Sequence, residues 1–179
     1  MFAGFGCKKN SAGNPSPRQQ PFCDSFVPGH VLVGYNNTVP MEEVFAYANA
    51  NGLSIVQMTG FDFTSPRPAD SIPSLQTLFN SKPYINSHGF LANIFADYRT
   101  RVVTIDNIYW DMTVSNQQDW VSTKNALGLT PVMGDSTNTP YILLQVPAGL
   151  EKYWALNLRT NNRVKWTELD CYMQINLWH

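Results

Sequence analysis

Few side chains in this sequence have the types and spacing that catalysis requires. Ser87 and His88 place a hydroxyl beside an imidazole, but adjacent side chains in a loop or strand are expected to diverge, so they do not predict a nucleophile and its base. The sequence also lacks a Gly-x-Ser-x-Gly elbow, a His-Glu-x-x-His motif and a phosphate-binding glycine loop. Several carboxylates are present that could pair by accident: Asp62, Asp97, Asp106, Asp111 and Asp119. The sequence therefore favours a protein that is not an enzyme, with a hydrolytic enzyme as the less favoured alternative.

Metal and cofactor chemistry has no support in the residue spacing. The three histidines, His30, His88 and His179, lie far apart, without a cysteine or carboxylate at ligand spacing. The sequence contains no Cys-x-x-Cys pair. We therefore predict neither a metal site nor a cofactor.

The three cysteines allow two interpretations. If Cys7 is modified, Cys23 and Cys171 remain as an even pair that could form a disulfide bond in an oxidising compartment. Such a bond would join the start of the domain to its last strand. Alternatively, Cys171 is a buried thiol in a strand and Cys23 a loop thiol. Because nothing in the sequence fixes the distance between them, the second interpretation is slightly favoured.

The N-terminal residues suggest how the protein is located in the cell. Residues 1–7 resemble the end of a bacterial lipoprotein signal, which implies cleavage before Cys7 and a lipid anchor on that cysteine. Residues 8–24 are rich in Pro, Ser, Asn and Gln and predict a flexible tether. We expect a protein of the bacterial cell envelope that contacts the membrane only through this anchor. The alternative is an ordinary cytosolic N-terminus with an incidental cysteine.

Composition narrows the classes of partner. The chain has 12 Lys and Arg against 13 Asp and Glu, and the basic residues are scattered, so nucleic acid is not an expected partner. A hydrophobic fraction of 44% suffices for a buried core. No apolar run approaches the roughly 20 residues that span a bilayer.

Hydrophobic periodicity predicts an α+β fold. Strands are expected at 30–35 and 53–58 with a helix between them that ends at Asn51-Gly52. Further elements are expected downstream: strand 102–114 with a bend near Asp106-Asn107, a helix that Ser115 and Gln118 cap and Gly128 ends, strands 130–133 and 141–146, a helix over 150–158 and a strand over 164–175. Residues 102–175 therefore have the ferredoxin-like order β-α-β-β-α-β. We predict two repeats, a degenerate one at 25–98 and a second at 99–179, with an antiparallel sheet and helices on one face. The alternative is that the first half shares a single sheet with the second.

Two segments resemble a known family. Residues 27–35, Val-Pro-Gly-His-Val-Leu-Val-Gly-Tyr, and residues 162–170, Asn-Arg-Val-Lys-Trp-Thr-Glu-Leu-Asp, are similar to the opening and end of subtilisin propeptide (peptidase inhibitor I9-like) domains. The resemblance implies a ferredoxin-like fold that assists folding of a protease and inhibits it with a C-terminal tail. The two segments are separated by more residues than one such domain contains.

The favoured function is binding without catalysis. A protein or a glycan of unknown identity would contact the sheet face or the loops, with Tyr98, Tyr109 and Trp110 as the possible binding surface. The alternative is a protease-inhibitor or propeptide-like module whose partner is a subtilisin-type protease. Its inhibitory tail would consist of the last four residues: Asn176, Leu177, Trp178 and His179.

Overall fold

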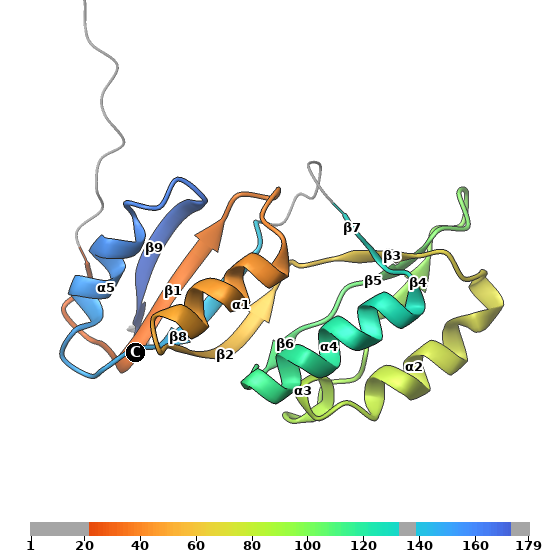
Figure 1. The fold of residues 1–179 in the computed structure, drawn as a ribbon, viewed down its shortest axis with the longest axis horizontal. Coiled ribbons are helices and arrows are strands. Elements are labelled where there is room, and N and C mark those ends of the chain that lie inside the picture. Colours follow the sequence, from red (N-terminus) through yellow and green to blue (C-terminus); the bar gives the residue numbers. More distant parts are fainter. Residues whose placement is uncertain (1–21, 133–138, 173–179) are drawn as a thin grey trace, which may run out of the picture.

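The computed structural model describes residues 22–132 and 139–172. It contains two antiparallel sheets and several helices, so the predicted α+β class is confirmed (Figure 1). The larger sheet, sheet A, has the strand order β6-β2-β8-β1-β9, and the smaller sheet, sheet B, has the order β4-β5-β3-β7. No helix of the described ranges is long and apolar enough to cross a membrane.

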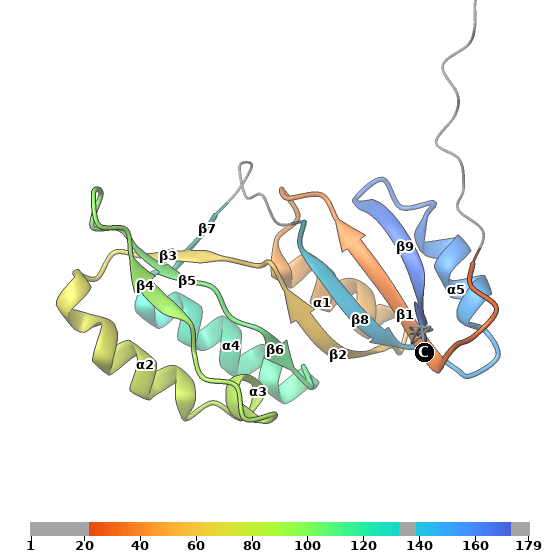
Figure 2. The same ribbon diagram turned by 180° about the vertical axis from the view of Figure 1, so that it is seen from behind.

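Sheet A is built from strands near the beginning and the end of the described chain, together with the short edge strand β6 from its middle. Its strands are β1 (Phe26–Tyr35), β2 (Ser54–Thr59), β6 (Tyr109–Trp110), β8 (Tyr141–Gln145) and β9 (Val164–Cys171). Helix α1 (Met41–Ala50) connects β1 to β2, and helix α5 (Glu151–Leu158) connects β8 to β9. Helix α1 lies in front of the strands in Figure 1 and behind them in Figure 2. Helix α5 contacts the same face, because the Thr167 hydroxyl donates a hydrogen bond to the Ala155 carbonyl at 2.8 Å.

The helix between β1 and β2 forms where periodicity predicts it. Its buried residues recur at helical spacing and form one apolar stripe: Met41, Val44, Phe45 and Ala48. Glu42 and Glu43 lie in the first turn, where the helix dipole favours negative charge. The helix ends before Gly52, whose φ of 64° lies in the left-handed region that glycine adopts without steric cost.

Residues 60–140 form an insertion between β2 and β8 that contains sheet B. Its strands are β3 (Phe63–Ser65), β4 (Ile94–Ala96), β5 (Val103–Ile105) and β7 (Thr130–Pro131). Its helices are η1 (Ala69–Ser71), α2 (Ile72–Asn80), α3 (Pro83–Asn86) and α4 (Val114–Leu127). Helix α4 begins two residues earlier than predicted, because the Thr113 hydroxyl, not Ser115, accepts a hydrogen bond from the Asn116 N–H.

The predicted division into repeats at 25–98 and 99–179 is corrected by the strand pairing. Strand β1 pairs with β8 and β9, and β2 pairs with β8, so sheet A combines strands from both predicted repeats. The predicted strand 102–114 is two short strands, β5 and β6, which belong to different sheets. The periodicity of a segment reveals its element type but not its partner strand, which explains the error.

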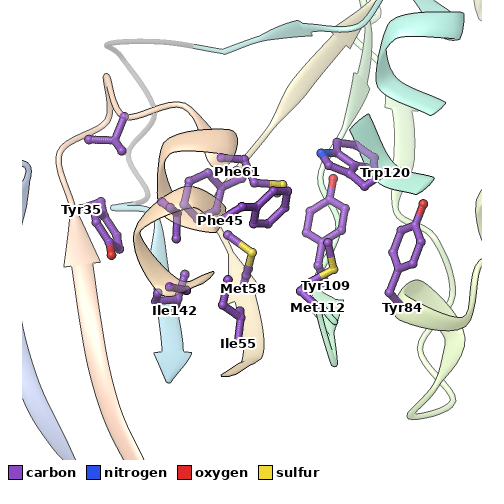
Figure 3. Close-up of a cluster of buried hydrophobic side chains, with 14 of the residues drawn as sticks. Tyr35, Phe45, Ile55, Met58, Phe61, Tyr84, Tyr109, Met112, Trp120 and Ile142 are labelled. Carbon is purple, nitrogen blue, oxygen red and sulfur yellow. The ribbon is translucent and has the colours of Figure 1, made fainter. Parts of the chain in front are cut away.

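A single hydrophobic cluster runs through both parts of the fold. Trp120 of α4 is fully buried, and its ring lies 4.8 Å from the Tyr109 ring and 5.0 Å from the Phe63 ring. Figure 3 shows Tyr109 and Trp120 in one cluster with Phe45 of α1 and Met58 of β2. Polar contacts also join α1 to α4, since Lys124 pairs with Glu42 and the Asn49 amide donates to Gln117 Oε1 at 2.8 Å.

Cys23 and Cys171 form a disulfide bond, with their Cα atoms 6.1 Å apart. The bond ties the segment before β1 to the last residue of β9. The slightly favoured interpretation of two separate thiols is therefore wrong. The strand register, which brings Phe26 opposite Cys171, supplies the proximity that the sequence alone did not reveal.

Candidate binding surface on sheet A

Sheet A has one face packed against helices and one open face. Val31, Val33, Ile142 and Leu144 point toward the helices and are fully buried. Successive side chains of a strand point to opposite faces, so their neighbours point the other way. Figure 2 shows this other face with no described helix in front of it.

Strand register arranges the open face in rows. The pairings Trp110–Gln57, Gln57–Leu143, Leu143–Leu32 and Leu32–Glu168 place one row across all five strands. A second row contains Thr59, Tyr141, Gly34 and Trp166. We call the side chains of these two rows, without the glycine, the open-face surface. It combines aromatic and aliphatic groups with one amide and one carboxylate.

Trp166 of the edge strand β9 lies over the neighbouring strand β1 because Gly34 has no side chain. A Cβ atom on Gly34 would lie 2.1 Å from Trp166 Cε2 and 2.2 Å from Nε1. The indole therefore rests on the backbone of the neighbouring strand. The Tyr141 ring lies 6.2 Å from the Trp166 ring, centroid to centroid. Two aromatic rings are thereby held side by side on the open-face surface.

Trp110 extends the surface toward the insertion. Its ring lies 4.2 Å from the His88 ring at an interplanar angle of 31°, and 5.7 Å from the Phe90 ring at 21°. Phe90 is 50% exposed, and Leu91 beside it is 73% exposed. The segment between α3 and β4 thus adds apolar groups at the β6 edge of the open-face surface.

Charge on this face is concentrated near β9. Glu168 is exposed, and Asp170 Oδ2 lies within hydrogen-bond distance of His30 Nδ1, at 2.9 Å. The side-chain amide of Gln145 lies close to Gly29, where a Cβ atom would be 2.2 Å from Gln145 Nε2. The face therefore offers apolar contact in its centre and hydrogen-bonding groups along one end.

Ser87 and His88 lie closer together than the sequence suggested. The Ser87 hydroxyl lies 2.9 Å from His88 Nδ1, so the expectation that these side chains diverge is wrong. Both residues are exposed, and the His88 ring packs on Trp110. The turn after α3 allows the contact. The imidazole therefore lies against an indole at the surface of the protein.

The predicted carboxylates have separate environments. Asp119 forms an ion pair with Lys82 at 2.8 Å and accepts a hydrogen bond from the Tyr84 hydroxyl at 2.7 Å. The Lys82 contact lowers the pKa of Asp119. Asp97 accepts hydrogen bonds from the Thr100 and Arg99 N–H groups of its own turn, and these lower its pKa. Asp62 and Asp106 are the exception, since their carboxyl groups lie together.

No group of three or more His, Cys, Asp and Glu side chains that could hold a metal ion occurs within 22–132 and 139–172. A shallow groove of about 260 Å³ lies where α1, β2 and α4 meet. Two of its lining side chains, Asn49 and Gln117, already bond to each other, and Gln117 also donates to the Met112 carbonyl at 2.7 Å. The side-chain amides of Asn49 and Gln117 are therefore already engaged in hydrogen bonds within the protein.

The structure places the predicted surface residues in different environments. Trp110 belongs to the open-face surface, but Tyr109 is fully buried, so its prediction as a surface residue is wrong. The two side chains point to opposite faces of β6, and burial raises the pKa of Tyr109. Tyr98 is 74% exposed but lies in the turn between β4 and β5, beside Arg99. Cys7 and residues 176–179 lie outside the described residues.

Sequence reasoning missed several residues of the surface: Leu32, Tyr141, Leu143, Trp166, His88 and Phe90. Alternation along 30–35 and 141–146 could have separated the two faces, but the register between distant strands was needed to align them.

The chain was compared with protein-family models, curated proteins and solved structures, and none of them matches it. The resemblance to propeptides of subtilisin-type proteases therefore stays a prediction.

Proposed function

We propose that this chain is a non-enzymatic binding protein of the bacterial cell envelope that holds a protein or glycan against the open-face surface of sheet A. One observation carries the proposal. Trp110, Trp166, Tyr141, Leu32 and Leu143 share one sheet face, and no described helix lies over that face. Contiguous apolar surface of this kind is typical of interaction sites.

We infer that the strands and helices around the insertion form a ferredoxin-like unit. Without residues 60–140, the element order is β1-α1-β2 followed by β8-α5-β9, which is β-α-β-β-α-β. The open face of such a unit is available for contact because both crossover helices lie on the other side. The insertion then adds the His88 and Phe90 rings beside the edge strand β6.

The disulfide bond supports a location outside the reducing cytoplasm. Structural disulfides form and persist in oxidising compartments such as the periplasm or the cell surface. Cys23 and Cys171 are separated by 148 positions in the sequence, so the bond between them constrains nearly the whole described fold. We propose that the protein is exported and is held at the membrane by a lipid on Cys7.

Site-directed crosslinking tests the proposed surface. A photoreactive residue is placed at Glu168 on the open face or, as a control, at Tyr153, which is 59% exposed on α5. In intact envelopes we expect crosslinks from position 168 that disappear when Trp166→Ala is added, and none from position 153. Equal crosslinking at both positions, or no crosslinks from position 168, would contradict binding of a protein to this face.

A parallel measurement addresses a glycan partner. The purified protein is sedimented with insoluble cell-wall polysaccharide, with Trp110→Ala and Trp166→Ala as test variants and Tyr153→Ala as the matched control. Stacking of a sugar on an indole is lost with the ring, so we expect both tryptophan variants to stay in the supernatant. If wild type and both variants sediment alike, the open-face surface does not bind that polysaccharide.

A second candidate function is a propeptide-like inhibitor of a subtilisin-type protease. It is supported by the position of the insertion, which accounts for the long separation between the two segments that resemble such propeptides. The C-terminal tail, Asn176–His179, would enter the substrate cleft as an added strand. Inhibition of a subtilisin-type protease is measured with the full chain and with a chain that lacks these four residues. If neither form inhibits, this candidate is excluded.

A further inference from the structure

Two of the backbone segments that carry the chain between the sheets are short. Strand β2 leaves sheet A after Thr59, and the chain enters sheet B at Phe63. Strand β5 leaves sheet B after Ile105, and the chain returns to sheet A at Tyr109. Figure 1 shows both segments at the junction of the two sheets. Each segment carries one aspartate, Asp62 in the first and Asp106 in the second.

Strand register places these two aspartates opposite each other. Phe63 pairs with Ile105 in the antiparallel ladder, so the next position along the ladder brings Asp62 opposite Asp106. Their carboxyl groups are close enough to form a hydrogen bond. Asn93 holds Asp106 from the other side, because its amide donates to Asp106 Oδ2 at 3.2 Å and its carbonyl accepts from the Asp106 N–H at 3.0 Å. Like charges directly opposite each other destabilise an antiparallel pair.

Within residues 22–132 and 139–172, the charged side chain that acts on Asp62 is Asp106. Asp62 Oδ1 is buried and, within the described ranges, has no hydrogen-bond partner. It borders a cavity of about 20 Å³ whose other lining residues do not titrate: Asn37, Val39, Pro40, Met41, Gly60, Phe61, Phe63, Pro131, Val132 and Pro140. The titratable groups that act on the pair are the two carboxyls themselves and the buried Tyr109 hydroxyl.

These surroundings favour a protonated carboxyl. Burial, and then the charge and hydrogen bond of Asp106, raise the pKa of Asp62 to about 6. Below that pH the Asp62 carboxyl is protonated and can donate a hydrogen bond to Asp106. Above it the ionised Asp62 carboxyl has no proton to donate.

We propose that Asp62 and Asp106 form a proton-dependent brace between two segments that cross from one sheet to the other, and that this brace tightens when Asp62 is protonated and loosens when Asp62 is ionised. Both segments run between the sheets at this point, so the brace holds together two of the connections that join sheet B to sheet A. This inference does not depend on the identity of any partner.

The brace makes a signed prediction for stability. The pKa of Asp62 is higher in the folded chain than its ordinary value of 3.8, so the folded state binds this proton more tightly than the unfolded state. The contribution of the brace to stability is fully present below the ordinary pKa and is lost as the pH rises through about 6. Acid therefore strengthens this junction, opposite to the effect of acid on most ion pairs.

The test compares thermal unfolding of wild type and Asp62→Asn at about pH 4.5 and about pH 7.5. The asparagine keeps the shape of the protonated carboxyl and still donates to Asp106. At the higher pH we expect the unfolding midpoint of the variant to exceed that of wild type by about 2–4 °C, which is the shift that a modest change in stability produces in a chain of this length. At the lower pH we expect the two midpoints to be equal. Asp111→Asn, an exposed aspartate near β6, is the matched control and should show no such pH-dependent difference.

A second measurement needs no variant of Asp62. Carbon NMR of the side-chain carboxyls should show Asp62 titrating near pH 6 in wild type and at lower pH in Asp106→Asn, where the opposing charge is absent. An ordinary titration of Asp62 in wild type, or a difference between Asp62→Asn and wild type that does not change with pH, would overturn the proposal. The experiments are repeated with a chelator, since a midpoint that depends on the chelator would show that a cation, not a proton, joins the two carboxyls.

Discussion

The indole of Trp166 lies directly over the backbone of Gly34, its cross-strand partner in sheet A. A side chain at position 34 would occupy the space of the ring, since the Cβ position lies 2.7 Å from Trp166 Cδ2 and closer to two other ring atoms. The pair explains how a large aromatic side chain stays flat on the open-face surface. The stability of a Gly34 variant therefore reports on the orientation of Trp166, which belongs to the proposed binding surface.

Gly34→Ala should displace the Trp166 ring. Because the added methyl group overlaps the indole, we expect a loss of about 1–3 kcal/mol in the free energy of unfolding, measured by chemical denaturation. The same variant should change the tryptophan emission of the folded protein. Gly34→Ala combined with Trp166→Ala should recover part of the loss. If the single variant unfolds like wild type, the ring does not rest on Gly34.

Tyr109 and Tyr84 form a matched pair for the role of buried hydroxyls. The Tyr109 hydroxyl has no hydrogen-bond partner among the described residues, whereas the Tyr84 hydroxyl donates to Asp119. Tyr109→Phe should therefore leave the free energy of unfolding unchanged or raise it by up to about 1 kcal/mol. Tyr84→Phe should lower it by about 1–3 kcal/mol, because it leaves a charged acceptor without this donor. A loss in both variants of equal size would show that Tyr109 also has a partner, for which a bound water is the natural choice.

The disulfide bond should contribute a large share of the stability. It closes a loop of 148 residues, and the chain-entropy treatment of such a loop gives about 5 kcal/mol. Cys23→Ala with Cys171→Ala should lower the free energy of unfolding by that order, and a reducing agent should destabilise wild type but not the double variant. Thiol titration of the denatured wild type should find no reactive sulfur at either position. Equal sensitivity of both proteins to the reducing agent would contradict this assignment.

Glu151 should make the fold sensitive to acid. Its carboxylate accepts hydrogen bonds from the Gly29 N–H at 2.6 Å and the Gly149 N–H at 2.9 Å, and these lower its pKa, the Gly29 contact most. Its contribution is therefore present above the ordinary pKa of a glutamate and is lost as the pH falls through the lower folded value. Glu151→Gln should lower the unfolding midpoint at neutral pH, and its difference from wild type should shrink in acid. A difference that persists unchanged in acid would exclude the charge as the cause.

Local elements could be predicted from the sequence because their signals are local. Strand β1, helix α1 and its end near Gly52 follow from alternation, a helical apolar stripe and a glycine with positive φ. The sequence also predicts a bend in the chain near Asp106. There the structure has a passage from one sheet to the other, where a bend within one strand was expected.

The assembly of these elements could not be predicted in the same way. The pairing of β2 with β8 joins Thr59 to Tyr141 across the whole insertion, and no local pattern encodes that contact. The repeat boundary was wrong for this reason, and so was the surface assignment of Tyr109 beside Trp110. The binding surface depends on register between distant strands, as the Gly34–Trp166 pair illustrates.

The continuous core has a consequence for how the protein loses its structure. The insertion leaves and rejoins sheet A at neighbouring strands, so it has the connectivity of a removable module. However, Tyr109, Met112 and Trp120 share one apolar interior with Phe45 and Met58 (Figure 3). Separating the parts would expose these side chains to water, so neither part has a melting event of its own, and calorimetry should record a single cooperative transition.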